Sequence, residues 1–296
     1  MRVLAPAKVN LALHVVGRRE DGYHLLDSLV VFAGIGDRIS ISQAKASRLT
    51  VTGPFADGVP TGSENLIRKA HALVPDAPQL EIELEKTLPH AAGIGGGSSD
   101  AGALLRALTE TFGCAMPPRD RILELGADVP VCLSHAPQRM RGIGERLGPV
   151  PPLPPLDLVL VNPGVAVPTG AVFGALPTAE GAPLGAMDWA DGRRERFIAW
   201  LGAQRNDLEP PARALAPDID AALAALSAAE GCLLARMSGS GATCFGLFDG
   251  RDGGAARAAA RAISAAHPDW WVQAAPVLGA GHDTSGERTP KAAWHS

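Results

Sequence analysis

A cluster of glycines that runs into two serines and an acid is the part of this sequence best suited to chemistry. The stretch PHAAGIGGGSSDAGALLRAL spans residues 89 to 108. Glycines let backbone N–H groups turn toward an anion without obstruction from a Cβ atom, and the first amides of a helix have no acceptor of their own. Ser98, Ser99 and Asp100 are each suitable N-cap residues for the helix that follows. The stretch therefore predicts a phosphate-binding loop at a helix N-terminus.

This loop differs from two familiar phosphate-binding motifs. A Walker A loop needs Gly-Lys-Ser/Thr, whereas Ser98 follows Gly97 here with no lysine between them. Gly93, Gly95 and Ser98 match the dinucleotide-binding fingerprint only approximately. A flexible glycine linker that ends in a helix cap is the alternative, because glycine and serine dominate ordinary turns.

Two further segments supply what a phosphoryl transferase needs besides a phosphate loop. Lys8 can provide a fixed positive charge, and Asp128, in GADVP, can orient or deprotonate a hydroxyl nucleophile. Each residue also has a plain structural explanation: Lys8 can snorkel from a strand edge, and Asp128 can cap a turn before Pro130. The combination of the three segments is more specific than any one of them.

The composition describes an ordinary globular protein. The chain has 296 residues, of which 46% are hydrophobic and 20% are charged, and its formal net charge is −4. That charge gives no general attraction to nucleic acid or to an anionic membrane, so neither is expected as a partner. No apolar run approaches the roughly 18 to 20 residues that span a bilayer. The N-terminal segment is interrupted by Lys8 and Asn10, so it predicts a strand rather than a signal peptide.

The four cysteines show no spacing typical of a metal site or a redox motif. They are Cys114, Cys132, Cys232 and Cys244. Two of them lie in apolar segments, where free cysteine is often buried. They predict a reducing, cytoplasmic location and no zinc.

Hydrophobic patterning predicts a strand-rich first half. Alternation over residues 9 to 15 predicts a strand with one face buried, which would project Lys8 and Asn10 from its other face. Similar patterns predict strands within 28 to 42, 48 to 52 and 80 to 85. Helices are predicted over 64 to 74, where Ser63 can be the cap, and over 99 to 112 and 118 to 126.

A proline-dense stretch, GPVPPLPP at 148 to 155, is the best candidate for a domain boundary. Beyond it, LDLVLVNP predicts a buried strand, and MSGSGATCFGLF at 237 to 248 predicts a turn that leads into a strand. Helices are predicted over 193 to 203, 218 to 229 and 253 to 266, and a closing strand over 270 to 277. Residues 279 to 296 lack periodicity and are expected to be disordered.

In order along the chain, these segments resemble the three motifs of the galactokinase, homoserine kinase, mevalonate kinase and phosphomevalonate kinase superfamily. The motifs are a Lys/Asn strand, a GxGGGSS-type loop and a late GSG loop. The match is most specific for the 4-diphosphocytidyl-2-C-methyl-D-erythritol kinase family, through APAKVNLALHVVGRREDGYHLLDSL at 5 to 29, GIGGGSSDAG at 93 to 102 and GADVPVCL at 126 to 133. PGVAVPTGAVF at 163 to 173 and NDLEP at 206 to 210 extend it. The resemblance covers residues 1 to 278.

The resemblance implies a reaction and a fold. The family transfers the γ-phosphoryl of ATP to the 2-hydroxyl of 4-diphosphocytidyl-2-C-methyl-D-erythritol, in the non-mevalonate route to isoprenoid precursors. The implied fold is α+β: a strand-rich N-terminal α/β kinase domain (1 to 150) and a ferredoxin-like C-terminal domain (155 to 278), with the active site in the cleft between them. The assembly expected is a monomer or a weak homodimer.

Roles follow from the resemblance residue by residue. Asp128 resembles the catalytic base and Lys8 its partner, and a neighbouring lysine favours the ionised carboxylate. Tyr23, His24 and Phe173 resemble the residues around the cytosine, where aromatic faces would stack on the base. A half-buried anchor is the alternative for Tyr23, and a satisfied core histidine for His24.

Further residues are implied on both sides of the cleft. Asn10 and Thr169 resemble residues along the diphosphate and ribitol-like portion of the substrate. Gly239, Ser240 and Gly241 match the third motif, which supports the phosphate loop and the acceptor side. Asn65 and Leu66 resemble the segment that touches adenine, although an ordinary helix start explains them nearly as well. The ATP loop itself comprises Pro89, His90, Ala91, Ala92, Gly93, Ile94, Gly95, Gly96, Gly97, Ser98 and Ser99.

Magnesium is implied by the use of ATP, because the metal offsets charge on the β- and γ-phosphates. No protein ligand is obvious; Ser99 is a candidate, and water can supply most of the coordination sphere. One departure from the family is His90-Ala91-Ala92, where relatives often carry glycine, so the loop's first turn is expected to use conformations that alanine tolerates. Nucleotide affinity could differ as a result.

Two alternative functions remain at this point. The first is a sibling kinase that acts on another small alcohol, such as homoserine or mevalonate; GYHLL at 22 to 26 argues against it, because an aromatic/histidine pair suits a nucleobase. The second is a catalytically silent homologue that binds nucleotide. The presence of both Lys8 and Asp128 argues against that alternative, because a pure binder needs neither.

Overall fold

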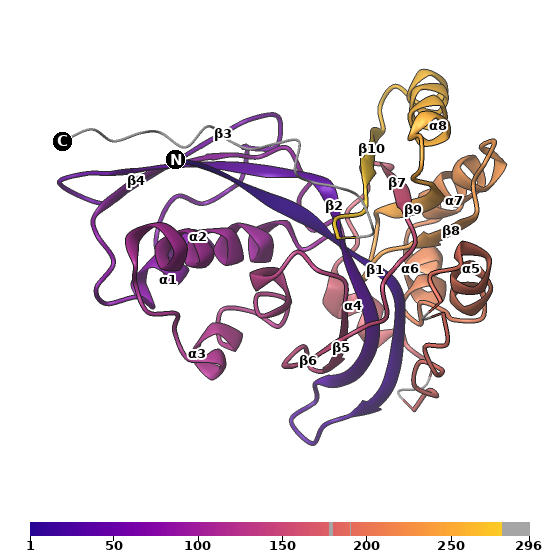
Figure 1. Cartoon of the computed structure of the whole chain (residues 1–296), viewed down its shortest axis with the longest axis horizontal. Helices are drawn as coiled ribbons and strands as arrows, with labels where there is room; N and C mark the ends of the chain where they lie inside the picture. Colours follow the sequence, from indigo (N-terminus) through magenta and orange to yellow (C-terminus); the bar gives the residue numbers. More distant parts are fainter. Residues whose placement is uncertain (178–179, 190, 280–296) are drawn as a thin grey trace.

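The computed structural model describes residues 1–177, 180–189 and 191–279. In these residues, two β-sheets lie side by side, each covered by helices, and the long strands β1 and β2 run from the first sheet toward the second (Figure 1). No helix in the described part of the chain is long and apolar enough to cross a membrane. All four cysteines are free thiols, and three of them are buried.

The first sheet has six strands in the order β3-β4-β2-β5-β6, with β1 paired to β2. Only β3 and β4 run parallel within it; the other pairs are antiparallel. Its strands are β1 (Arg2–Arg18), β2 (His24–Gln43), β3 (Arg48–Thr52), β4 (Leu80–Glu85), β5 (Gln138–Gly142) and β6 (Arg146–Pro149). The helices of this unit are α1 (Leu66–Ala72), α2 (Gly96–Phe112), α3 (Arg119–Leu123) and the 3-10 helix η1 (Val131–Leu133).

The second sheet has the antiparallel strand order β10-β7-β9-β8. That order, with helices α7 and α8 packed against the sheet, is the ferredoxin-like arrangement predicted for this half. Its strands are β7 (Leu156–Asn162), β8 (Leu234–Met237), β9 (Cys244–Asp249) and β10 (Trp271–Pro276). Its helices are α4 (Thr169–Gly174), α5 (Arg194–Gly202), α6 (Glu209–Leu215), α7 (Asp218–Ala228) and α8 (Gly254–Ala266).

Strand β1 is buried on both faces from Ala5 to Val15, whereas its alternating pattern predicted a single buried face. Only Ala5 belongs to the core beneath the first sheet, whereas the apolar residues from Ala7 to Val15 pack in clusters that include residues of the second unit. The polar side chains of Lys8, Asn10 and His14 are therefore buried as well. A buried polar group is costly unless it is paired, so each of them must find a partner inside the protein.

The predicted helices all occur, but several begin or end elsewhere. The third helix is shorter than predicted, because α3 ends at Leu123. Ser63 was predicted as the cap of α1, and this was wrong: Asn65 is the N-cap, and its Oδ1 accepts a bond from the Ile67 amide at 2.8 Å. The short elements α4, α6, η1, β5, β6 and β8 were not predicted, since each is too brief to show a periodic pattern.

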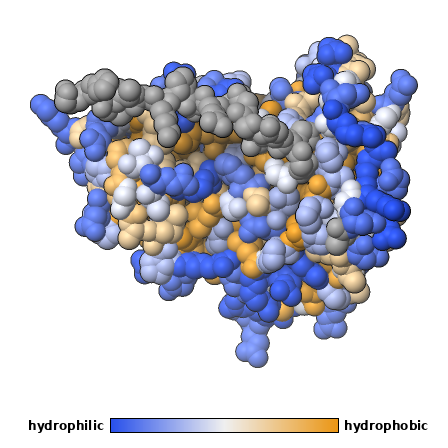
Figure 2. All heavy atoms as spheres, in the orientation of Figure 1, coloured by the Kyte–Doolittle hydropathy of each residue, from blue (hydrophilic) through white to orange (hydrophobic). Residues whose placement is uncertain are grey.

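The chain passes from one sheet to the other across the proline-dense stretch, because β6 ends at Pro149 and β7 begins at Leu156. A domain boundary at this stretch remains our proposal. Apart from Gly279, the tail expected to be disordered, 279 to 296, lies outside the described residues. Hydrophilic side chains cover much of the rim of the molecule, whereas hydrophobic ones are visible toward its middle (Figure 2).

Candidate active site

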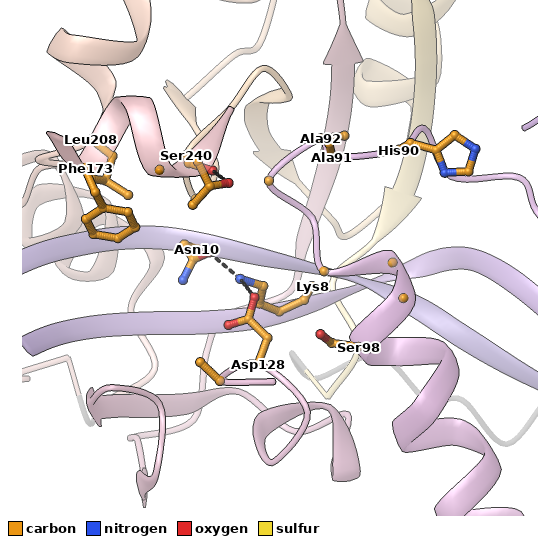
Figure 3. A pocket seen from close by; sticks show the side chains of 18 of the residues that line it. Lys8, Asn10, His90, Ala91, Ala92, Ser98, Asp128, Phe173, Leu208 and Ser240 are labelled. Atoms are coloured by element: carbon orange, nitrogen blue, oxygen red, sulfur yellow. Dashed lines mark hydrogen bonds and ion pairs between the residues drawn. The ribbon is translucent and has the colours of Figure 1, made fainter. Parts of the chain in front are cut away.

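A cavity of about 1450 Å³ opens between the two units. Most residues predicted for the two substrates line it, and Figure 3 shows several of them projecting inward from different elements. The predicted residues in its lining are Lys8, Asn10, Tyr23, His24, Asn65, Leu66, Pro89, His90, Ala91, Ala92, Gly93, Gly95, Gly96, Gly97, Ser98, Asp128, Thr169, Phe173, Gly239 and Ser240. Segments more than 200 residues apart in sequence thus meet at one cavity.

At the centre of this lining, Lys8 and Asp128 form an ion pair. The Lys8 Nζ lies 3.0 Å from the Asp128 Oδ2 and donates a hydrogen bond to the Asn10 Oδ1 at 2.8 Å (Figure 3). Asn10 in turn donates to the Ser28 hydroxyl at 2.8 Å. The lysine side chain is only 4% exposed, whereas the aspartate is 33% exposed. A buried cation therefore holds an accessible carboxylate in place, which is the arrangement that a general base needs.

The glycine loop brings backbone amides to the same point. Gly95 is the N-cap of α2 and has a φ of +64°, a left-handed conformation that favours glycine. A Cβ atom there would lie 3.1 Å from the Lys8 Cε and would crowd the lysine side chain. The first N–H groups of a helix lack intrahelical acceptors. Gly96, Gly97 and Ser98 of that first turn line the cavity, which makes it suitable for an anion.

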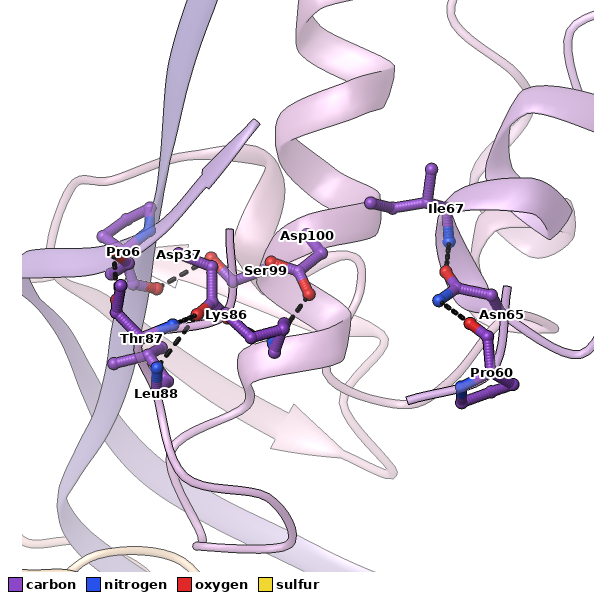
Figure 4. A network of polar contacts seen from close by, with 11 residues as sticks. Pro6, Asp37, Pro60, Asn65, Ile67, Lys86, Thr87, Leu88, Ser99 and Asp100 are labelled. Carbon is purple, nitrogen blue, oxygen red and sulfur yellow. Dashed lines mark hydrogen bonds and ion pairs between the residues drawn. The ribbon is translucent and has the colours of Figure 1, made fainter. Parts of the chain in front are cut away.

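The helix start was predicted at the wrong residue. Ser98, Ser99 and Asp100 were candidate N-caps, but α2 begins at Gly96, and no side chain caps it. Ser99 is completely buried, and its hydroxyl donates to the Pro6 carbonyl at 2.7 Å (Figure 4). Its suggested role as a metal ligand therefore does not fit. An earlier start leaves the first-turn amides free for a ligand.

Ala91 adopts a left-handed conformation with a φ of +47°, the only such non-glycine residue in the described part of the chain. The loop's first turn was expected to use conformations that alanine tolerates, and the one observed at Ala91 lies near the small left-handed region, which alanine rarely adopts. The next residue ties the loop to the second unit, since the Ala92 carbonyl accepts a bond from the Thr243 amide at 3.2 Å. Two other predicted residues, Ile94 and Gly241, do not line the cavity; the side chain of Ile94 is buried in the core.

A buried ion cluster supports the loop from behind, and sequence reasoning did not find it. Lys86 bridges the carboxylates of Asp37 and Asp100, the latter at 2.9 Å (Figure 4). All three side chains are at most 5% exposed. Asp37 also accepts the amides of Thr87 and Leu88, at 2.6 and 2.9 Å. Burial raises the pKa of the Asp100 carboxyl to about 7, although the Lys86 charge opposes the shift. One signal was visible: Lys86 directly follows the strictly alternating LEIELE strand.

The third motif packs directly onto the glycine loop. The Ser238 hydroxyl donates to the Gly93 carbonyl at 3.0 Å and accepts a bond from the backbone N–H of Asn10 at 3.1 Å. A Cβ atom at Gly239 would lie 2.7 Å from the same Gly93 carbonyl, so this close approach requires glycine. Thr169 and Ser240 share a hydrogen bond of 2.8 Å at the cavity wall. The late GSG turn therefore braces the phosphate loop and contributes to the cavity.

Asn206 holds that turn in place and was also missed, although NDLEP was noted as a motif. Its amide nitrogen donates to the carbonyls of Met237 and Gly239 at 2.8 and 2.9 Å. Its oxygen accepts the Leu208 amide at 3.0 Å. All three hydrogen bonds of this buried side chain serve backbone groups, which explains why an amide is needed here.

At the far end of the cavity, His24 and Phe173 stack with ring centroids 4.9 Å apart and planes inclined by 23°. Partial burial lowers the pKa of the His24 imidazole, and the charge of Arg18 lowers it further. Tyr23 also lines the cavity but is 61% exposed, so its ring is available to a ligand. The half-buried anchor considered for Tyr23 and the core histidine considered for His24 are therefore not observed.

Asn65 and Leu66 also line the cavity, and Asn65 is at the same time the cap of α1. Its amide nitrogen donates to the Pro60 carbonyl at 2.7 Å, which ties the preceding turn to the helix (Figure 4). Among the residues that the structure describes, no cluster of His, Cys, Asp and Glu could hold a metal ion.

Comparison with known proteins identifies the family of this chain. The model for the GHMP kinases N terminal domain matches residues 64–137, and the model for the GHMP kinases C terminal matches residues 189–269. A 4-diphosphocytidyl-2-C-methyl-D-erythritol kinase from Dinoroseobacter shibae is 59% identical, over 90% of this chain and 92% of its own. The chain belongs to the 4-diphosphocytidyl-2-C-methyl-D-erythritol kinase family. A family member from Cereibacter sphaeroides is 53% identical, over 93% of this chain and 98% of its own.

Solved structures support the same assignment of fold. A crystal structure of 4-(cytidine 5'-diphospho)-2C-methyl-D-erythritol kinase aligns with a TM-score of 0.76 at 37% identity, over 94% of this chain and 99% of that one. Homoserine kinase from Cytophaga hutchinsonii aligns with a TM-score of 0.66 at 21% identity, over 94% of each chain. The second likeness concerns the fold alone. The predicted α+β kinase fold of two units is thus confirmed.

Proposed function

We propose that this protein transfers the γ-phosphoryl group of ATP to the 2-hydroxyl of 4-diphosphocytidyl-2-C-methyl-D-erythritol. Its family membership supports this reaction. The observation that carries the proposal is the Lys8–Asp128 pair, which lies in one cavity with the first turn of α2 and with the His24–Phe173 stack. A phosphoryl acceptor with a nucleobase at its far end would span these features.

In this proposal, Asp128 is the catalytic base. Its carboxylate would accept the proton of the 2-hydroxyl as the oxygen attacks the γ-phosphorus in line with the leaving ADP oxygen. The ion pair with Lys8 and the exposure of one third of the side chain support this role, because the carboxylate is oriented and still reachable. Lys8 would steady negative charge on the attacking oxygen while Asn10 fixes its ammonium group.

On the nucleotide side, the first-turn amides of α2 would bind the phosphates of ATP. Residues Pro89 to Ser98 would wrap around them, and Asn65 and Leu66 would lie near the adenine. The ion cluster of Lys86, Asp37 and Asp100 supports the proposal indirectly, since it fixes the loop that must be pre-organised.

Magnesium belongs to the same proposal. When it is bound, the metal offsets the charge of the β- and γ-phosphates. Mg²⁺ usually keeps several waters and binds substrate phosphates together with one or two carboxylates, and in P-loop enzymes a Ser/Thr hydroxyl also holds it. The Ser98 hydroxyl lines the cavity beside the first turn of α2, which makes it the candidate protein oxygen in place of Ser99.

On the acceptor side, Tyr23, His24 and Phe173 would bind the cytosine between aromatic faces. Asn10 and Thr169 would line the path of the diphosphate and of the methylerythritol part, and Gly239 and Ser240 would close the acceptor side. We further propose that the enzyme works in the cytoplasm as a monomer or weak homodimer. Its four free cysteines suit a reducing compartment.

One assay tests the function and both alternatives. ADP release is measured with 4-diphosphocytidyl-2-C-methyl-D-erythritol, homoserine and mevalonate as separate acceptors, and the phosphorylated product is identified by mass spectrometry. We expect turnover with the cytidine compound alone. Turnover only with homoserine or mevalonate would indicate a sibling kinase, and nucleotide binding without turnover on any acceptor would indicate a silent homologue.

A further inference from the structure

The cations that line the cavity are not equally available to a ligand. Lys8 is paired with Asp128, and Lys86 is paired with two buried aspartates. Arg18 lines the same cavity, and within residues 1–177, 180–189 and 191–279 it forms no ion pair. Both proposed substrates carry phosphates, so an unpaired cation in this lining requires an explanation.

A glycine turn holds the Arg18 side chain. Arg18 is the last residue of β1 and lies opposite His24 in the β1–β2 register. Its Nε donates to the Gly22 carbonyl at 3.2 Å, which fixes the guanidinium and leaves its two terminal nitrogens for other acceptors. Gly22 has a φ of +90°, and a Cβ atom there would lie 3.7 Å from the Arg18 Nη2. That distance is an ordinary contact, so it is the left-handed backbone that favours glycine at this turn.

The groups near Arg18 do not neutralise its charge, so Arg18 is the cation beside the His24–Phe173 stack. Asp21, the nearby acid of the same turn, is paired with Arg19 at 2.7 Å rather than with Arg18. Burial and the charge of Arg18 lower the pKa of the His24 imidazole, which favours its neutral form, and the ring stacks on Phe173. A neutral aromatic surface and a fixed cation therefore lie side by side where a nucleobase and its phosphates would.

We infer that Arg18 binds the diphosphate of the cytidine diphosphate portion of the acceptor and so helps to select a charged nucleotide over a neutral nucleoside. The inference rests on the proposed function. A guanidinium presents parallel N–H donors that match phosphate oxygens in a bidentate fork, and such charge-assisted bonds are stronger than neutral ones. A diphosphate is separated from its base by one ribose, so a cation beside the stacking surface can reach it.

The test compares cytidine 5'-diphosphate with cytidine as probes. Dissociation constants are measured by calorimetry with the ATP site filled by a non-hydrolysable ATP analogue. We expect Arg18→Gln to weaken cytidine diphosphate binding about tenfold or more and cytidine binding less than about twofold. Arg18→Lys should recover part of the loss, because it keeps the charge without the fork. The control is Arg48→Gln, an exposed arginine of β3 outside the cavity lining, which should change neither constant.

Equal losses for both probes in Arg18→Gln would overturn the inference, since the residue would then act on the base or on the turn. Unchanged cytidine diphosphate binding would overturn it as well. Raising the salt concentration should weaken the wild-type complex with cytidine diphosphate more than the Arg18→Gln complex. These binding results are separate from catalysis: a wild-type protein that binds cytidine diphosphate but does not phosphorylate the full acceptor would contradict the proposed function and not the role of Arg18.

Discussion

The two ends of the cavity are built in different ways. At the phosphate-loop end, the cavity is lined largely by the glycine and alanine residues of the loop, and the buried cluster of Lys86, Asp37 and Asp100 packs beside them. At the nucleobase end, the wall is made of side chains, including the exposed ring of Tyr23 and the His24–Phe173 stack.

The difference teaches how each kind of ligand is recognised. Backbone amides bind phosphate only if the chain is held in one conformation, so that end needs hydrogen bonds and ion pairs beneath it. Stacking on a base requires open aromatic faces, so that end needs side chains that water reaches before the ligand arrives. Damage at the first end should therefore affect folding and binding together, whereas damage at the second should affect binding alone.

The largest expected effect lies between the two ends, at Asp128. We expect Asp128→Asn to lower turnover at least about a hundredfold, because the amide cannot accept the proton of the hydroxyl. Binding of the ATP analogue and of the acceptor should change little. Steady-state kinetics and calorimetry measure both quantities, with Asp120→Asn, an exposed acid of α3, as the control. Near-normal turnover would discard the base assignment.

Lys86→Met should break the phosphate-loop end from beneath. The substitution leaves two buried carboxylates without their cation, which typically costs about 3–5 kcal/mol of unfolding free energy. Urea unfolding and ATP-analogue binding should both weaken, because the loop loses its support. The matched control is Lys69→Met, an exposed lysine of α1. If stability fell while ATP binding stayed intact, the cluster would be supporting the fold but not the loop.

Phe173→Ala should break the nucleobase end alone. Stacking of a base on an aromatic ring contributes about 1–3 kcal/mol, so the KM for the acceptor should rise about fivefold or more. The KM for ATP and the unfolding free energy should stay close to wild type, because Phe173 is only partly buried against its core. A parallel loss of ATP binding would show that the two ends are not independent.

The smallest effect is expected from Ala91→Gly, which sharpens the comparison at the loop. The φ of +47° at Ala91 strains the backbone of an alanine, and glycine adopts that conformation without a Cβ clash. The greater freedom of glycine in the unfolded chain offsets part of the gain. We expect an increase in unfolding free energy of up to about 1 kcal/mol, measured by thermal and urea unfolding. A clear loss of stability would mean that the alanine methyl group makes contacts that outweigh the strain.

Much of the fold was accessible from sequence because its elements are long or strictly periodic. The LEIELE alternation predicted β4, and the alanine-rich run predicted α8. The start of α2 was misplaced because Ser98, Ser99 and Asp100 all suit an N-cap, whereas a glycine cap leaves no side-chain signal. Ser99 was wrongly suggested as a metal ligand because its partner is not visible in the local sequence. Its hydroxyl donates to the carbonyl of Pro6, a residue 93 positions away.

The candidate site was partly predictable in the same sense. Lys8, Asp128 and the glycine loop belong to motifs whose residue types suit phosphoryl transfer. No such motif pointed to Lys86, Asp37 or Asn206, because each of these residues acts through partners that are distant in sequence. Arg18 was also missed, since its lack of an ion-pair partner can be recognised only after the neighbouring charges have been paired.

The sequence by itself determined the family, the glycine loop, the two reactive side chains and the order of the longer elements. These are local properties of residue type and spacing, or motifs that can be matched one by one. Only the tertiary structure decided which side chains are accessible and which are paired. In the folded chain, β1 is buried on both faces, Lys8 forms an ion pair with Asp128, and Ser99 is buried. Accessibility and pairing depend on contacts between distant segments, and those contacts arise when the two units pack around the same strand.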